Sequence, residues 1–223
     1  MPLTLHYFPL AGRAEVARLL LHTATKKVEW TDKRHEFAEW AQAVKAKAPF
    51  GQLPCLELED GSFLAQSSAI DRYLAVKTGA EPKDELAWAR SDEAYAFLED
   101  VWLTLAPTMR LKDDAEKLAA RKAACEGPLK EKLDLLDAHL AKLGDTAWFS
   151  GLDRPSYADY SVWNWMCVLK CGWLEGVPED IWANHKAIVA FHARVAALDG
   201  IKSWYALPEN QDATRQKGAS VAA

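Results

Sequence analysis

The chain has 223 residues, a formal net charge of −5 at pH 7 and a hydrophobic fraction of 50%. This is the composition of an ordinary folded protein, and its acidic balance lacks the basic stripe that is typical of nucleic-acid binding. No apolar run approaches the roughly 18 residues of a membrane-spanning helix, so we expect neither nucleic acid nor a membrane among the partners.

The cysteines favour a reducing setting without a metal. There are four, Cys55, Cys125, Cys167 and Cys171, and their spacing matches neither a zinc site nor a CxxC motif. Free cysteines are usually small buried hydrophobic residues. No basic segment followed by an apolar one resembles a secretory signal. We therefore expect a cytoplasmic protein that holds no metal.

The first 78 residues predict four strands and two helices. The alternation of Leu3, Leu5 and Tyr7 with the residues between them predicts a strand, and apolar residues at helical spacing follow it. The expected elements, in chain order, are strand 3–7, helix 13–25, strand 28–31, strand 55–58, strand 62–64 and helix 67–78.

This order of elements predicts a mixed sheet. A helix between the first two strands is a crossover connection, so these strands should be parallel. Asp60-Gly61 is a two-residue hairpin signal, so the last two strands should be antiparallel. Gly79 is suited to end the last helix. Residues 1–78 should therefore form a domain in which helices cover a four-stranded mixed sheet.

The second part of the chain has no strand signal. Gly and Pro in 79–84 predict a linker, and 85–205 should form an all-α helical bundle. Ser156 and Asp159 have the spacing of a capping box, which predicts a helix start. Residues 206–223 carry few large apolar side chains, so a disordered tail is expected. The expected helices are 84–109, 115–143, 157–171, 179–184, 186–197 and a short one near Trp204.

Tyr7 and Arg13 flank the turn between the first strand and the first helix. A tyrosine hydroxyl at the end of a strand can donate to an anion above the sheet, and a thiolate is such an anion. Arg13 and the amides of the first helical turn add positive potential. Together they would keep a bound thiol ionised near neutral pH. The structural alternative is that Tyr7 packs inward and Arg13 pairs with Glu15 or Asp32.

Leu53 and Pro54 precede the third strand. If their peptide bond is cis, the chain turns sharply and the backbone of Leu53 is free to pair with an extended peptide at the sheet edge. The local sequence alone favours an ordinary trans bond, because few X-Pro bonds are cis. Both alternatives stay open at this point.

The start of helix 67–78 has the features of an anion site. Ser67 or Ser68 can cap the helix, and the free amides and macrodipole of a helix N-terminus attract negative charge. The Ser67 hydroxyl and the side-chain amide of Gln66 would add donors to a bound carboxylate. The alternative is a capped helix without a ligand.

Four segments taken together resemble the cytosolic glutathione transferases, most closely the sigma class, which contains prostaglandin D synthases. They occur in the order of that family and span residues 2 to about 205: "YFPLAGRAEVARLLL", "EFAEWAQAVKAKAPFGQLP", "QSSAIDRYLA" and "RPSYADYSVW". The resemblance implies a thioredoxin-like N-terminal domain, an all-α C-terminal domain and a homodimer. It also implies that glutathione is the co-substrate.

The resemblance assigns roles to individual residues. Tyr7 would bond to the glutathione sulfur, and Arg13 would support Tyr7. Leu53, before the family's cis-proline at Pro54, would pair its backbone with the cysteinyl part of glutathione. The side chains expected at the two ends of glutathione are Gln66 and Ser67 at the γ-glutamyl end, and Trp40, Lys45 and Gln52 at the glycyl end.

The resemblance implies conjugation of glutathione to hydrophobic electrophiles, as in detoxification, and isomerase or peroxidase activity can accompany it. The electrophile is expected beside the sulfur, where an apolar and aromatic wall suits such molecules. The residues expected in this wall are Phe8, Trp102, Pro107 and Met109.

The sequence departs from the sigma pattern between Trp40 and Phe50, where it is one residue longer. Lys45 is therefore only the better of several lysine candidates for the glycyl carboxylate, and Lys47 is the next. Phe50 resembles an aromatic residue that some classes insert into the partner subunit. The class also takes an acidic residue from the partner, and four residues qualify: Asp92, Glu93, Glu99 and Asp100.

Two other functions remain as alternatives. A transferase-like chain can be a non-catalytic ligand-binding or structural protein, but such a protein has no need for the combination of Tyr7, Arg13, Gln66 and Ser67. A glutathione-dependent thiol–disulfide exchanger would carry Cys or Ser near the end of the first strand, whereas Cys55 lies inside the third strand.

Overall fold

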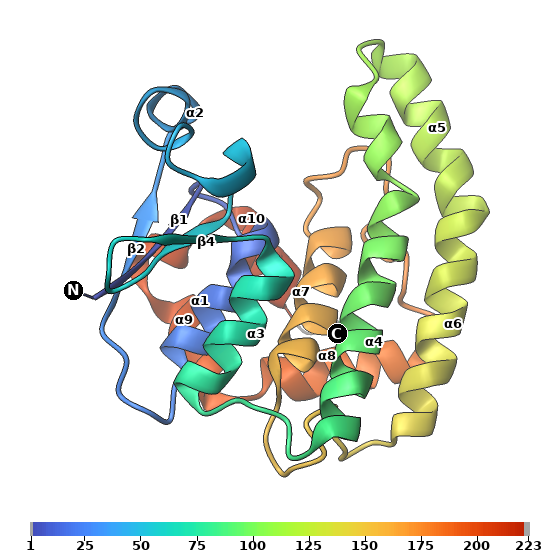
Figure 1. Cartoon of the computed structure of the whole chain (residues 1–223). Coiled ribbons are helices and arrows are strands. Elements are labelled where there is room, and N and C mark those ends of the chain that lie inside the picture. Colours follow the sequence, from blue (N-terminus) through green and yellow to red (C-terminus); the bar gives the residue numbers. More distant parts are fainter. Residues whose placement is uncertain (1, 221–223) are drawn as a thin grey trace.

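A four-stranded sheet with its helices stands beside a bundle of longer helices in the computed structural model, which describes residues 2–220 (Figure 1). The elements of the first part are β1 (Leu3–Tyr7), α1 (Glu15–His22), β2 (Trp30–Arg34), α2 (Phe37–Glu39), β3 (Cys55–Glu57), β4 (Phe63–Ala65) and α3 (Ser67–Thr78). Short 3-10 turns at 12–14 and 49–51 and a π-helical turn at 40–44 connect them. The predicted α+β character of this part is confirmed.

The sheet has the strand order β2-β1-β3-β4. β1 is parallel to β2, and β3 is antiparallel to both β1 and β4, so the predicted mixed sheet is confirmed. The predicted strand 28–31 is misplaced, because β2 begins at Trp30 and continues to Arg34. β2 is an edge strand, and its charged, partly exposed side chains are typical of an edge and weaken the hydrophobic pattern.

The second part is entirely helical, as predicted. Three of the predicted helices are wrong. The expected helix 84–109 ends at Leu103, and a separate 3-10 turn follows at 106–110. The expected helix 115–143 is divided at Gly127, because Pro128 lacks the N–H that would continue the first helix. The expected helix 179–184 is a series of turns. The helices are α4 (Glu85–Leu103), α5 (Asp114–Glu126), α6 (Pro128–Leu143), α7 (Tyr157–Lys170), α8 (Lys186–Ala196), α9 (Asp199–Ala206) and α10 (Ala213–Ala219).

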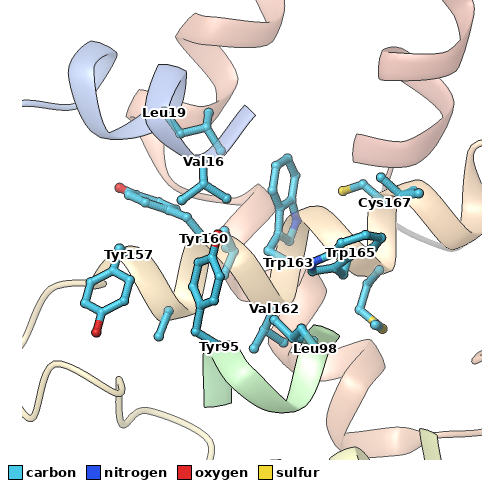
Figure 2. Packing of buried hydrophobic residues seen from close by; sticks show 14 of the residues in the cluster. Val16, Leu19, Tyr95, Leu98, Tyr157, Tyr160, Val162, Trp163, Trp165 and Cys167 are labelled. Carbon is cyan, nitrogen blue, oxygen red and sulfur yellow. The ribbon is translucent and has the colours of Figure 1, made fainter. Parts of the chain in front are cut away.

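Helix α7 is the centre of the core. The predicted capping box is confirmed, since the Ser156 N–H donates to Asp159 Oδ2 at 2.7 Å and the Ala158 N–H donates to Ser156 Oγ. Every residue from Tyr157 to Leu169 is buried, which is what a helix surrounded on all sides requires. Figure 2 shows α7 between side chains of α1 and side chains of α4, so it joins the two parts of the molecule.

A buried ion pair fixes α1 against the sheet. The Arg18 guanidinium is fully buried, and it donates to the carboxylates of Glu15 at 3.2 Å and Asp32 at 3.1 Å. It also donates to the carbonyl oxygens of Phe8 at 3.1 Å and Leu10 at 2.7 Å. Arg18 therefore holds the whole turn that follows β1.

The same ion pair reaches the C-terminal segment. Glu15 Oε1 accepts hydrogen bonds from Trp204 Nε1 at 2.8 Å and from the Tyr205 hydroxyl at 3.0 Å. Arg215 Nε lies 3.6 Å from the same oxygen. Three C-terminal side chains thus converge on one carboxylate of α1.

The prediction of a disordered tail from residue 206 is wrong for the described residues, while 221–223 lie outside them. A 3-10 turn at 208–210 leads to α10, which packs on α7. His192 Nε2 of α8 donates to the Gly218 carbonyl at 3.1 Å and lies 3.4 Å from Cys167 Sγ. Polar contacts of this kind hold α10 without large apolar side chains, and hydrophobicity is therefore a poor guide to its order.

We expect Arg18→Met to lower the free energy of unfolding by about 3–5 kcal/mol, because it leaves the carboxylates of Glu15 and Asp32 without their buried counter-charge. Urea unfolding followed by circular dichroism measures the effect. Arg90→Met, at an exposed arginine of α4, is the matched control and should change stability by less than about 0.5 kcal/mol. Equal effects of the two substitutions would contradict the central role of Arg18.

We expect acid to destabilise the protein through His192. Burial lowers its pKa to about 4 from an ordinary value of 6.5. Between these pH values the unfolded chain binds a proton that the folded chain does not bind, so stability present at pH 7 is lost as the pH falls. The loss approaches about 1.4 kcal/mol per pH unit within this window.

Urea unfolding of wild type and His192→Gln at pH 7, 6 and 5 tests this expectation. The variant lacks the titrating group, so the stability difference between the two proteins should shrink as the pH falls. His139→Gln, at an exposed histidine, should keep the wild-type slope. Parallel pH profiles for wild type and His192→Gln would show that the expectation is wrong.

Candidate active site

Tyr7 ends β1, and its hydroxyl lies against the 3-10 turn at 12–14 that precedes α1. The Arg13 backbone N–H donates to Tyr7 Oη at 3.2 Å. Burial raises the pKa of Tyr7 above its ordinary value, although the Arg13 N–H and the charge of Arg18 oppose the rise. Tyr7 therefore keeps its proton at neutral pH. A phenol that accepts a backbone hydrogen bond has its own proton free to donate to an anion.

Gly12 makes the close approach of the turn to Tyr7 possible. Its φ is +49°, and a Cβ there would lie 2.8 Å from Tyr7 Oη. The Asn164 side-chain amide of α7 donates to the Gly12 carbonyl at 3.0 Å. The turn is thus held from the helical side as well as by Arg18.

Arg13 pairs across the molecule and not with Glu15 or Asp32. Its guanidinium donates to the two carboxylate oxygens of Glu99 in α4 at 2.6 and 2.9 Å, and it lies 5.7 Å from the ring centre of Trp165. Glu15 and Asp32 are bound by Arg18 instead. Neither structural alternative for Arg13 is therefore realised.

The Leu53–Pro54 peptide bond is cis, as the family resemblance implies and the local sequence does not. The backbone N–H and C=O of Leu53 have no hydrogen-bond partner within residues 2–220. In the segment before Leu53, Lys45 lies next to Gly51, which precedes Gln52. The Cε and Cγ atoms of Lys45 are 3.8 and 3.9 Å from the position that a Cβ would take at Gly51.

The N-terminus of α3 lies next to this segment. Gln66 is the N-cap with a φ of +71°, and its side-chain amide donates to Gln52 Oε1 at 3.1 Å. Ser67 is the first residue of the helix and is buried, so neither Ser67 nor Ser68 is the cap that the sequence suggests. The free amides of this terminus remain available to an anion.

Beneath Ser67 lies a buried pair that sequence reasoning missed. The Tyr95 hydroxyl of α4 donates to Asp71 Oδ2 at 2.9 Å, and burial raises the pKa of Asp71 well above its ordinary value. Asp71 follows Ser67 by one helical turn and therefore shares its face. That spacing is the only local signal for the pair, because the partner lies 24 residues away.

An apolar cavity of about 270 Å³ opens beside Tyr7. Phe8 and Trp102, both expected there, line it, and Pro107 and Met109 do not. Met109 instead contacts Arg121 Nη2 through its sulfur. Sequence reasoning missed the contribution of other segments, because these lie far apart in the chain: Phe37, Trp165, Cys167, Cys171, Trp173, Thr214 and Arg215 also line the cavity.

The acidic candidates for the partner's site are mostly engaged within their own chain. Glu99 binds Arg13, Asp92 binds Arg72 and the Tyr157 hydroxyl, and Asp100 lies 3.0 Å from Lys132. Glu93 is exposed and has no ion pair within residues 2–220.

Residues 2–220 contain no group of three metal-ligating side chains close enough to hold an ion. No helix in this part of the chain combines the length and the hydropathy needed to cross a bilayer.

Comparisons with known proteins agree with the observed fold. Residues 1–76 match the family model for the N-terminal domain of glutathione S-transferases, and 99–207 match the model for the C-terminal domain. The chain is 34% identical to glutathione S-transferase 1 of Ascaris suum, over 91% of this chain and 94% of that protein. It is 33% identical to hematopoietic prostaglandin D synthase of Gallus gallus, over 90% and 93%. The crystal structure of the glutathione S-transferase from Ascaris lumbricoides superposes with a TM-score of 0.76 at 31% identity, covering 92% of this chain and 97% of that one.

Proposed function

The chain belongs to the glutathione S-transferase family, and from that premise we propose that it conjugates reduced glutathione to hydrophobic electrophiles through a thiolate stabilised by Tyr7. One observation carries the proposal. The protonated Tyr7 hydroxyl lines an apolar cavity, and Tyr7 ends β1, which pairs with β3, the strand that follows Leu53 and Pro54. A thiol placed there meets a donor on one side and an apolar electrophile on the other.

Glutathione is proposed to lie extended along the sheet edge. The free backbone groups of Leu53 would pair with its cysteinyl residue, as in strand addition. The γ-glutamyl carboxylate would meet the amides of α3, the Ser67 hydroxyl and Gln66. The residues proposed for the glycyl end are Trp40, Lys45 and Gln52, and the contact of Lys45 with Gly51 favours Lys45 over Lys47.

The chemical step needs the sulfur as a thiolate. A free thiol with a pKa near 8.5 is only a few per cent ionised at pH 7. A hydrogen bond to a charged group contributes about 1.5–3 kcal/mol, which corresponds to a fall of roughly one to two pKa units. The thiolate sulfur then forms a bond to the electrophilic carbon, and the leaving group departs with the electron pair of the broken bond.

Arg13 is proposed to position Tyr7 and not to contact the sulfur. Its backbone N–H bonds to Tyr7 Oη, which polarises the O–H bond toward the thiolate. Its guanidinium is bound to both oxygens of Glu99 and keeps the turn in place. The positive potential at the sulfur is thus proposed to come mainly from the amides of α1.

The quaternary and cellular setting is also proposed. We infer a homodimer in which Phe50, 78% exposed on its loop, inserts into the partner subunit.

The division into domains 1–78 and 85–205 with a linker at 79–84 remains a prediction. None of the four cysteines forms a disulfide in the described part of the chain, which supports a reducing, cytoplasmic setting.

The observations weigh against a thiol–disulfide exchanger. Burial raises the pKa of Cys55 to about 12, so this thiol is not an attacking thiolate at neutral pH. A non-catalytic binding protein would need the apolar cavity but not the donor at its edge. Conjugation of glutathione to a chloronitroaromatic, followed by absorbance, distinguishes an enzyme from such a protein.

We expect Tyr7→Phe to reduce the conjugation rate at pH 6.5 about 10- to 100-fold while leaving glutathione binding largely intact, because it removes the donor to the thiolate. The rate deficit should shrink toward pH 9, where the thiol ionises without help. Initial rates across this pH range measure the effect. Tyr160→Phe is the matched control, since Tyr160 is a buried tyrosine whose hydroxyl bonds to Thr23. A wild-type rate for Tyr7→Phe at pH 6.5 would refute the assigned role.

We expect Ser67→Ala to raise the KM for glutathione about 10-fold or more with little change in kcat, because it removes a hydrogen bond to a charged group at the γ-glutamyl end. Ser68→Ala changes the neighbouring, exposed serine and should behave as wild type. If both variants saturate with glutathione as the wild type does, Ser67 does not bind the substrate.

A further inference from the structure

We propose that α10 is the wall that selects the electrophile, and that it restricts the cavity to small, flat aromatic electrophiles. Thr214 and Arg215 of α10 line the same cavity as Tyr7. The match to the family's C-terminal domain ends at residue 207, so α10 is a feature of this chain beyond that match. The inference rests on the proposed function, since it takes this cavity as the electrophile site.

The wall is anchored at its inner end by charge. Arg215 is buried and pairs with Asp212 at 2.6 Å as well as lying 3.6 Å from Glu15. Its pKa is raised, because these two carboxylates outweigh the burial that would lower it. The guanidinium therefore stays charged and keeps α10 close to α1, next to the turn that follows Tyr7.

The wall also closes tightly on α7. A Cβ at Gly218 would lie 2.9 Å from the Cys167 carbonyl oxygen and 3.1 Å from Cys167 Cβ, so only glycine permits this approach. The Gly218 carbonyl accepts a hydrogen bond from His192, and Cys167 itself lines the cavity. The distance between α10 and α7, and with it the width of the cavity, is fixed by these contacts.

Further polar contacts hold the outer side of α10. Gln216 Nε2 donates to the carbonyls of Tyr205 at 2.8 Å and Asn210 at 3.0 Å. Lys217 pairs with Glu179, and Lys170 Nζ donates to the Ser220 hydroxyl at 3.0 Å. With contacts on both sides, α10 is a fixed boundary and not a loose end that moves aside for a large ligand.

The size and lining of the cavity indicate what fits. Its volume of about 270 Å³ is just below the range of about 300–1,000 Å³ that is typical of sites for drug-sized ligands. Its wall includes the large aromatic rings of Phe8, Phe37, Trp102, Trp165 and Trp173. Aromatic faces favour a planar ring stacked or edge-on against them. A single activated ring fits these limits, and a fused or long-chain electrophile would overlap α10.

Two electrophiles with the same chemistry and different sizes test the proposal: 1-chloro-2,4-dinitrobenzene and 1-chloro-2,4-dinitronaphthalene. In both, the glutathione thiolate forms a bond to the ring carbon and chloride leaves with the electron pair of the carbon–chlorine bond. The measured quantity is the ratio of kcat/KM for the naphthalene to kcat/KM for the benzene. We expect wild type to favour the benzene.

Two variants should shift this ratio in opposite directions. Truncation after Gln211 removes α10 and should raise the ratio at least 10-fold without changing the KM for glutathione. Thr214→Trp adds bulk at the cavity and should lower the ratio at least 5-fold. Ala213→Trp adds the same bulk one residue away, at an exposed position that does not line the cavity, and should keep the wild-type ratio.

The outcomes separate the inference from the function on which it rests. If the truncated chain does not fold, the ratio measured for Thr214→Trp alone tests the inference, because Thr214 is exposed and its substitution leaves the core intact. Conjugation of both compounds with the same ratio in wild type and Thr214→Trp would overturn the inference and leave the function intact. If neither compound reacts, the proposed function is wrong, and quenching of tryptophan fluorescence by the two arylated glutathiones then tests whether α10 selects by size.

Discussion

The fully buried ion pair between Glu15 and Arg18 is the constraint on which the rest of the structure depends. Charges removed from water are tolerated only when nearly all of their donors and acceptors are filled. Arg18 fills its donors with carbonyls of the turn after β1 and with Asp32 of β2. Glu15 fills its second oxygen with Trp204 and Tyr205 of α9. The sheet, the Tyr7 turn and the C-terminal segment must therefore assemble around α1 together.

The parts of the fold that sequence patterns predicted are those with a local cause. β1 alternates in hydrophobicity, Asp60-Gly61 makes a hairpin, and the Ser156–Asp159 spacing makes a capping box, so each is legible in a few residues. The patterns failed at β2, because its charged side chains are those of an edge strand. They also failed at Gly127-Pro128, where the hydrophobic pattern of a helix continues although the backbone of Pro128 cannot continue the helix.

The interactions that complete the candidate site have no local cause. Arg13 and Glu99 are 86 residues apart, and Asn164 reaches Gly12 across 152 residues. Glu15 and Asp32 are closer to Arg13 in the sequence than Glu99 is. Arg13 does not pair with them because Arg18 occupies both carboxylates in the folded structure. The order of the C-terminal segment is hidden from sequence patterns for a related reason. Helix α10 is held by polar contacts of His192 and Arg215 and needs no apolar stripe. The composition of this segment therefore resembles that of a disordered one.

The two halves of the candidate site differ in how they are encoded. The proposed glutathione half lies within residues 7–67 and uses backbone groups, a helix N-terminus and one turn, so a few short motifs contain nearly all of it. The cavity proposed for the second substrate draws on side chains from residue 7 to residue 215. Its shape depends on how distant helices pack, and no short motif records that packing. Membership of the family therefore points to glutathione as the thiol, and in our proposal the wall built by α7 and α10 decides what that thiol reacts with.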